Sequence, residues 1–134
     1  MANKNRQMEM HEVLNELSSE IGKFVNDKTV GVGIDLEGER TINPSGSKYF
    51  MHLREERFFD KAINTDLVLL WTIKEALFKS TPENNDIVLR NFEVVSIADN
   101  SGEAICNSKD DLHYSFFSRT IDKNFVTVAI CYRD

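Results

Sequence analysis

The sequence is poor in the residues that build disulfide frameworks and metal knuckles, and it lacks long apolar runs. Its 134 residues include two cysteines, two prolines and three histidines. Two cysteines are too few for a disulfide framework, so Cys106 and Cys131 are interpreted as reduced core thiols of a cytoplasmic protein. No apolar run approaches the roughly 18 to 20 residues of a membrane helix. The N-terminus has neither the apolar stretch nor the cleavage pattern of an export signal.

Positive charge is also scarce. The chain has 16 Lys and Arg residues against 22 Asp and Glu residues, which gives a net charge of -6. This balance disfavours nucleic-acid binding through a broad basic surface. The hydrophobic content of 41% and the charged content of 28% are ordinary for a globular chain. The length fits one domain over residues 1–134, with the polar residues 1–8 expected to be disordered.

Hydrophobic periodicity predicts an α+β fold, in which an antiparallel sheet packs against a long buried helix. Helices are expected over residues 9–24, 47–62 and 64–80, and Pro82 follows the end of the third. Strands are expected over residues 30–37, 92–98, 103–107, 112–118 and 124–132, with a hairpin turn at DNSGE.

The stretch WTIKEALFK, residues 71–79, places a glutamate and two lysines in a mostly apolar helix. At about 100° per residue, Thr72, Glu75 and Lys79 fall in one strip, whereas Lys74 sits apart, where its stem is expected to snorkel. A helix that is hydrophobic nearly all round is usually buried, so the strip either touches solvent narrowly or lines a cleft. An exposed Glu75–Lys79 pair, worth about 0.2–0.5 kcal/mol, explains the pattern equally well.

In VGVGIDLE, residues 30–37, the two-residue period of a strand places Gly31, Gly33, Asp35 and Glu37 on one face. The two bare positions allow a ligand or another backbone to come close. The two carboxylates repel each other unless a cation or partner joins them, and Mg²⁺ suits hard oxygen ligands. A strand whose polar face meets water explains the same pattern, and is favoured while this motif is considered alone.

Together the two stretches resemble the signature motifs of the 4'-phosphopantetheinyl transferase superfamily. These motifs are (V/I)G(I/V)D, often continuing as D-x-E, and then W/F-x-x-K-E-A/S-x-x-K. The length resembles the short holo-acyl-carrier-protein synthase type, whereas the Trp and the D-x-E are more similar to the two-domain type. NFEVVSIADNSGEA and FFSRTIDKNFVTVAIC are similar to later strands of the family. The resemblance covers roughly residues 28–132 and implies a 4'-phosphopantetheinyl transferase-like fold.

This resemblance implies transfer of 4'-phosphopantetheine from coenzyme A to a serine of an acyl or peptidyl carrier protein, with Mg²⁺, in fatty acid or polyketide biosynthesis. It implies Asp35, Glu37 and Glu75 as metal ligands. Glu75, or a water that it holds, would be the base. Lys79 would steady the phosphate or protonate the departing 3',5'-ADP. In the short type the sites form between neighbouring subunits, so a homotrimer is implied.

The resemblance also implies coenzyme A contacts for Lys74, Lys79 and Arg119. Arg119 stands where the short type usually has a histidine, so it would have to serve as the phosphate-binding cation. No Ser-His pair precedes Asp35, as the two-domain type would have. These departures motivate an alternative, in which the chain is a catalytically impaired relative that binds coenzyme A or a carrier protein without transfer.

A docking surface for the carrier protein is the last expectation. Carrier proteins are acidic along their recognition helix, so basic residues are expected opposite them. On the helix expected over residues 47–62, Arg54, Arg57 and Lys61 would share one face, and Arg40 and Lys48 could extend it. A solvated face balanced by acidic neighbours is the interpretation we favour for this charge run.

Overall fold

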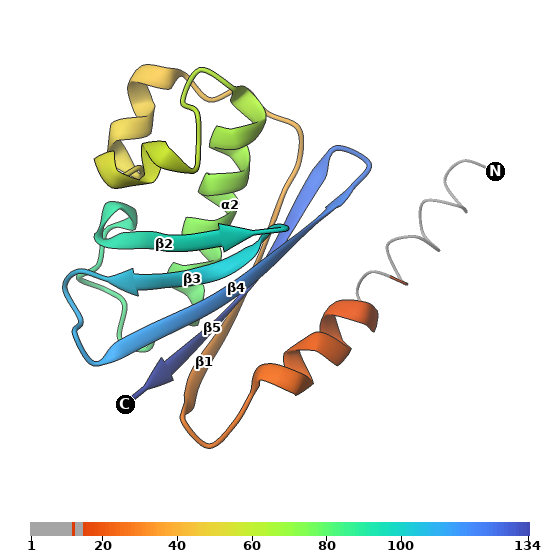
Figure 1. The fold of residues 1–134 in the computed structure, drawn as a ribbon, viewed down its shortest axis with the longest axis vertical. Coiled ribbons are helices and arrows are strands. Elements are labelled where there is room, and N and C mark those ends of the chain that lie inside the picture. Colours follow the sequence, from red (N-terminus) through yellow and green to blue (C-terminus); the bar gives the residue numbers. More distant parts are fainter. Residues whose placement is uncertain (1–11, 13–14) are drawn as a thin grey trace.

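The structure is a computed structural model that describes residue 12 and residues 15–134. Its centre is a five-stranded sheet with the strand order β1-β5-β4-β3-β2, in which every neighbouring pair is antiparallel. Figure 1 shows α2 behind the sheet and the helix of residues 15–24 beside it. Within the described residues, no helix is long and apolar enough to cross a membrane.

The strands match their predicted positions closely, and the mixed α+β class is confirmed. β4 runs three residues further than expected, because β4 and β5 meet in a turn of only two residues, Asp122 and Lys123, both with positive φ. Asp99 and Asn100 make the same kind of turn between β2 and β3. The elements are β1 (Thr29–Glu37), α2 (Asn64–Ser80), β2 (Phe92–Ala98), β3 (Ser101–Cys106), β4 (Leu112–Ile121) and β5 (Asn124–Arg133).

The helix predicted over residues 47–62 is wrong. Two short 3-10 helices, η1 (Pro44–Tyr49) and η2 (Leu53–Arg57), occupy this segment, and a third, η3 (Leu89–Asn91), precedes β2. Asn43 and His52 each accept a hydrogen bond from the backbone N–H two residues on, which caps η1 and η2 separately. Such local bonds compete with a continuous α-helix. Arg54 and Arg57 lie three residues apart in η2 and so share one of its faces, but Lys61 lies beyond the end of η2.

The core lies on both faces of the sheet. Along β5, Ala129 and Cys131 face α2, whereas Val128 and Ile130 belong to the opposite cluster together with Leu17 of the N-terminal helix. The helix predicted over residues 9–24 is present over 15–24, and its first residues and the predicted disorder of 1–8 lie outside the described residues. Both cysteines are free and buried, which confirms their interpretation as core thiols.

The two glycines of β1 explain how α2 approaches the sheet. A Cβ on Gly31 would lie 1.9 Å from the Ser80 carbonyl oxygen, and one on Gly33 would lie 2.2 Å from the Ala76 carbonyl oxygen. The bare positions thus receive the backbone of α2, which decides between the two possibilities left open by the sequence. As a result, α2 lies directly over β1, and the carboxylates that follow the glycines meet the polar side of the helix.

Candidate active site

The candidate site begins with an ion pair between β1 and the last turn of α2. Lys79 Nζ lies 2.7 Å from Asp35 Oδ1, and the Asp35 side chain is only 7% exposed, whereas that of Lys79 is 48% exposed. Lys79 Nζ also donates to the Ile34 carbonyl oxygen at 3.4 Å. The alternation of β1 turns Asp35 inward, and the helical period turns Lys79 toward it. The pair therefore bridges the line of contact between β1 and α2, which we call the seam.

The second oxygen of Asp35 has no partner. Oδ2 is buried and accepts no hydrogen bond from the described residues. An unsatisfied buried carboxylate oxygen costs free energy unless a donor or a cation reaches it. Burial raises the pKa of Asp35, the charge of Glu37 raises it further, and Lys79 opposes both effects. Oδ2 of Asp35 is therefore a buried oxygen that a donor or a cation could stabilise.

Glu75 and Glu37 share the electrostatic environment of Asp35. Burial raises the pKa of Glu75, and the negative charges of Asp35 and Glu37 raise it further. Glu37 accepts a hydrogen bond from Trp71 Nε1 at 3.1 Å and lies 3.5 Å from Arg40 Nη1. The seam thus gathers three carboxylates around one ammonium group and one guanidinium group.

The strip predicted on α2 needs one correction. Thr72 is fully buried, and its hydroxyl is satisfied by donating to the Val68 carbonyl oxygen one turn earlier. The seam is lined instead by Trp71, Glu75 and Lys79, which are spaced four residues apart on α2. Trp71 was absent from the candidate residues, although this spacing could have found it. Arg40 was expected to dock a carrier protein, and it lies with its guanidinium 5.3 Å from the centre of the Trp71 ring.

A divalent cation fits the chemistry of the seam. Across residue 12 and residues 15–134, no three His, Cys, Asp or Glu side chains are already arranged to hold a metal ion. Hard carboxylate oxygens are nevertheless the ligands that Mg²⁺ prefers, and Asp35 Oδ2 is a buried oxygen with a free lone pair. Lys79 already places one positive charge against the other oxygen of Asp35. The carboxylate oxygens of the seam are therefore of the chemical kind that Mg²⁺ prefers.

Lys74 lies away from the seam. Its side chain is 0% exposed, and Nζ donates to Glu55 Oε1 at 2.8 Å and to the Phe92 carbonyl oxygen. The expectation that Lys74 snorkels to solvent is wrong, because its ammonium group has two acceptors in the core. The structure does not bring Lys74 to a surface where coenzyme A could reach it, so Lys74 lies outside the candidate site.

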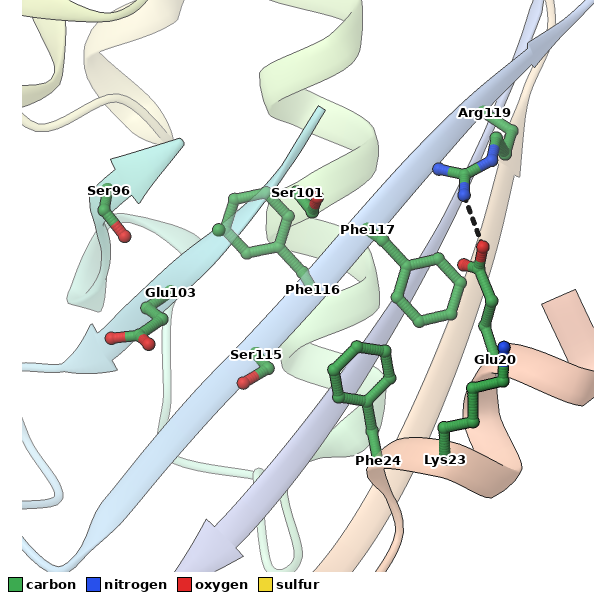
Figure 2. A pocket seen from close by; sticks show the side chains of 11 residues that line it. Glu20, Lys23, Phe24, Ser96, Ser101, Glu103, Ser115, Phe116, Phe117 and Arg119 are labelled. Atoms are coloured by element: carbon green, nitrogen blue, oxygen red, sulfur yellow. Dashed lines mark hydrogen bonds and ion pairs between the residues drawn. The ribbon is translucent and has the colours of Figure 1, made fainter. Parts of the chain in front are cut away.

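Arg119 lies on the other face of the sheet from Asp35. It pairs in β4 with Val126, which packs against the N-terminal helix, whereas Asp35 pairs with Thr127. Its guanidinium lies 2.6 Å from Glu20 Oε1 of that helix and borders a cavity of about 490 Å³ (Figure 2). Within one chain, Arg119 therefore cannot serve the carboxylates of the seam.

The remaining basic residues are dispersed. Arg54 donates two hydrogen bonds of 3.1 Å to the buried carboxylate of Glu93. Arg57 lies over the ring of Phe58, and Lys48 lies near the ring of Tyr49. Carrier-protein docking through Arg40, Lys48, Arg54 and Arg57 stays a prediction, because only Arg54 and Arg57 share a helix, η2.

Comparison with known proteins bears on the chain as a whole. No curated protein sequence matches it at a significant level. The sequence model of the 4'-phosphopantetheinyl transferase superfamily matches residues 31–131, and this span includes both signature motifs and runs from within β1 to within β5. Because the match covers most of the chain, the protein belongs to the 4'-phosphopantetheinyl transferase superfamily.

Proposed function

We propose that this protein transfers 4'-phosphopantetheine from coenzyme A to a serine of an acyl or peptidyl carrier protein, with Mg²⁺ bound at the seam. The family supports a phosphopantetheinyl transferase-type function in general, and such enzymes use coenzyme A and Mg²⁺. The observation that carries the proposal is the buried Asp35 carboxylate, which has a free oxygen on the seam shared with Glu75 and Lys79. We place this activity in the cytoplasm, in fatty acid or polyketide biosynthesis.

Each side chain of the seam has a role in the proposed reaction. Asp35, Glu37 and Glu75 would hold Mg²⁺, which when bound neutralises charge on the pyrophosphate of coenzyme A. Glu75 takes the proton of the carrier serine, directly or through a water. Without a bound cation, burial raises the pKa of Glu75, which suits a proton acceptor.

The bond changes involve Lys79 as well. The serine oxygen forms a bond to the β-phosphorus, and the bond from that phosphorus to the 3',5'-ADP oxygen breaks. Lys79 stays protonated, because its hydrogen bond to Asp35 raises its pKa. It can therefore stabilise the charge that develops on 3',5'-ADP, or donate a proton to it.

A homo-oligomer would bring a further cation, Arg119 of a neighbouring copy, to the seam. The face of β1 opposite α2 exposes four aliphatic side chains, of which Ile34 is 49% and Leu36 is 55% exposed. An apolar row on an edge strand is a common site of association. We propose that copies associate here as a trimer, and that Arg119 of one copy approaches the seam of the next. Ile34→Glu should then reduce the mass measured by light scattering, and an unchanged monomer mass in both proteins would overturn this assembly.

The reaction is tested by intact-mass spectrometry of several apo carrier proteins, incubated with this protein, coenzyme A and Mg²⁺. The expected result is a mass gain of one phosphopantetheine that Glu75→Gln abolishes. The second candidate, a relative that binds without transfer, is favoured by one observation: Glu20 already neutralises Arg119. No mass gain on any carrier, with coenzyme A still binding in calorimetry, would establish that second candidate instead.

A further inference from the structure

A fully buried ion pair lies beneath the seam, on the far side of α2. The side chains of Lys74 and Glu55 are both 0% exposed, and Lys74 Nζ lies 2.8 Å from Glu55 Oε1. Glu55 Oε1 also accepts from the His52 N–H, and Oε2 accepts from the Val94 N–H, each at 2.7 Å. The carboxylate is thus satisfied on both oxygens.

These bonds connect three segments that are distant in sequence. Glu55 belongs to η2, Lys74 to α2 and Val94 to β2, and Lys74 also donates to the carbonyl oxygen of Phe92 in β2. All four bonds have directional requirements, unlike apolar contacts. The pair therefore specifies one orientation of α2 relative to η2 and the start of β2.

Apolar packing specifies the rotation of α2 only weakly. Leu67, Val68, Leu70, Ile73, Ala76 and Leu77 are all buried, and together they surround most of the helix. An amphipathic helix has one apolar stripe that selects its orientation, but a helix that is apolar nearly all round can bury comparable surface in several rotations. A directional polar pair can supply the missing specificity, which is the best-attested use of buried polar groups.

The rotation of α2 decides where the seam residues point. Lys74 and Glu75 are consecutive, so their side chains diverge by about 100° around the helix axis. With Lys74 directed at Glu55 and β2, Glu75 is directed at β1. Trp71 and Lys79, one turn before and after Glu75, contact Glu37 and Asp35 in the same orientation.

We infer that Lys74 and Glu55 are positioning residues, which set the rotation of α2 so that Glu75 and Lys79 meet Asp35 across the seam. This inference rests on the proposed function for its catalytic consequence. Its structural part, the rotation of α2, can be measured without any transfer reaction. Lys74, the first lysine of the Lys-Glu-Ala motif, acts from the core in this assignment and contacts no coenzyme A.

The test replaces the pair with a neutral pair of similar size, Glu55→Gln with Lys74→Met. Replacing both members of a buried ion pair is often nearly neutral for stability, whereas removing one is not. The matched control is Glu39→Gln with Lys123→Met, which removes an exposed lysine–glutamate pair of 3.9 Å outside the seam and the expected docking face. Both double variants receive the same two measurements.

The first measurement is the fluorescence of Trp71, the only tryptophan of the chain. Rotation of α2 would break its bond to Glu37 and change its contact with the Phe50 ring, whose centre lies 5.2 Å away. We expect a red-shifted emission and stronger acrylamide quenching in the buried-pair variant, and neither change in the control. This readout reports the rotation even if the protein transfers nothing.

The second measurement is the steady-state rate of transfer. Misplacement of a catalytic group by about 1 Å can cost about 100-fold in rate, so we expect kcat to fall roughly 10- to 100-fold. KM for coenzyme A should stay within about threefold, since the ground-state binding groups remain. The control should leave both parameters unchanged.

Unchanged Trp71 emission in a folded double variant would overturn the inference. A lower melting temperature would overturn it too, if the emission and kcat measured well below that temperature equal those of the wild type. If the double variant does not fold, Glu55→Gln with Lys74→Gln, which leaves no unpaired charge in the core, decides by the same readouts. No transfer by the wild-type protein would overturn the proposed function, while the fluorescence result would still decide the rotation.

Discussion

α2 carries two lysine–carboxylate pairs that have nearly the same length and opposite surroundings. Lys74 and Glu55 are separated by 2.8 Å and are both 0% exposed, whereas Lys79 and Asp35 are separated by 2.7 Å at a seam where Lys79 is half exposed. Glu55 has acceptor bonds on both oxygens, but Asp35 leaves Oδ2 without one. A closed pair can only support the fold, whereas an open pair can still accept a ligand.

The largest effect on activity should come from Glu75, on the side of α2 that faces the seam. Glu75→Gln keeps the size of the side chain and removes its charge and basicity. We expect kcat for phosphopantetheine transfer to fall by about 10²- to 10⁴-fold, the usual contribution of a general base. Intact-mass kinetics would measure this, with far-UV circular dichroism as the control for folding. A variant that retained more than a tenth of the wild-type rate would show that Glu75 is not the base.

Loss of Lys74 should destabilise the protein more than loss of Lys79, although only Lys79 lies at the proposed site. Lys74→Met leaves the buried Glu55 carboxylate without its counter-ion, which should lower the free energy of unfolding by about 3–5 kcal/mol. Lys79→Met removes a half-exposed partner from the Asp35 carboxylate, so a smaller loss of about 1–2 kcal/mol is expected. Urea denaturation of both variants would measure the difference. Equal losses would erase the distinction between a closed and an open pair.

Gly33 tests how closely α2 approaches β1. In Gly33→Ala the new Cβ would meet the backbone of α2 at 2.2 Å, a clash that only a shift of the helix can relieve. We expect the free energy of unfolding to fall by about 2–3 kcal/mol, as for other overpacked sites. Gly46→Ala is the matched control, because nothing lies within 4 Å of its Cβ position. A wild-type midpoint for Gly33→Ala in urea would contradict the close approach of α2 to β1.

The smallest effect is a dependence of stability on pH. Burial raises the pKa values of Asp35 and Glu75, so the folded protein holds their protons more tightly than the unfolded chain does. Their contribution is present below the unfolded pKa values, near 4, and is lost as pH rises through the folded values. Without Mg²⁺, Glu75→Gln should therefore raise the melting temperature by about 1–3 °C at pH 7, after allowance for solvent screening.

Melting temperatures measured across pH and with added Mg²⁺ test this prediction further. The difference between Glu75→Gln and the wild type should shrink as the pH falls toward 4, because Glu75 then becomes neutral too. Mg²⁺ should raise the melting temperature of the wild type more at pH 7 than at pH 5, since its ligands must be deprotonated. A difference that is constant with pH, or no response to Mg²⁺, would count against a strained carboxylate cluster.

Much of the architecture follows from local sequence patterns. The alternation in β1 and the near-continuous apolar surface of α2 are short-range signals, and they predicted both elements and the face that Asp35 shares with the two glycines. The segment 47–62 was mispredicted as a helix, because side-chain caps at Asn43 and His52 outweigh its helical periodicity. Capping depends on the geometry of single hydrogen bonds, which periodicity does not register.

The sequence by itself determined the family and the strand pattern, and it predicted that Glu37, Glu75 and Lys79 lie near Asp35, because these signals are written in short motifs. Only the tertiary structure decided that the glycines of β1 admit a helix backbone, that Lys74 is buried against Glu55, and that Arg119 lies across the sheet from Asp35. These three outcomes depend on the rotation of α2 and on the register of five strands. Both arise from contacts between residues that are far apart in the chain, which no local pattern contains.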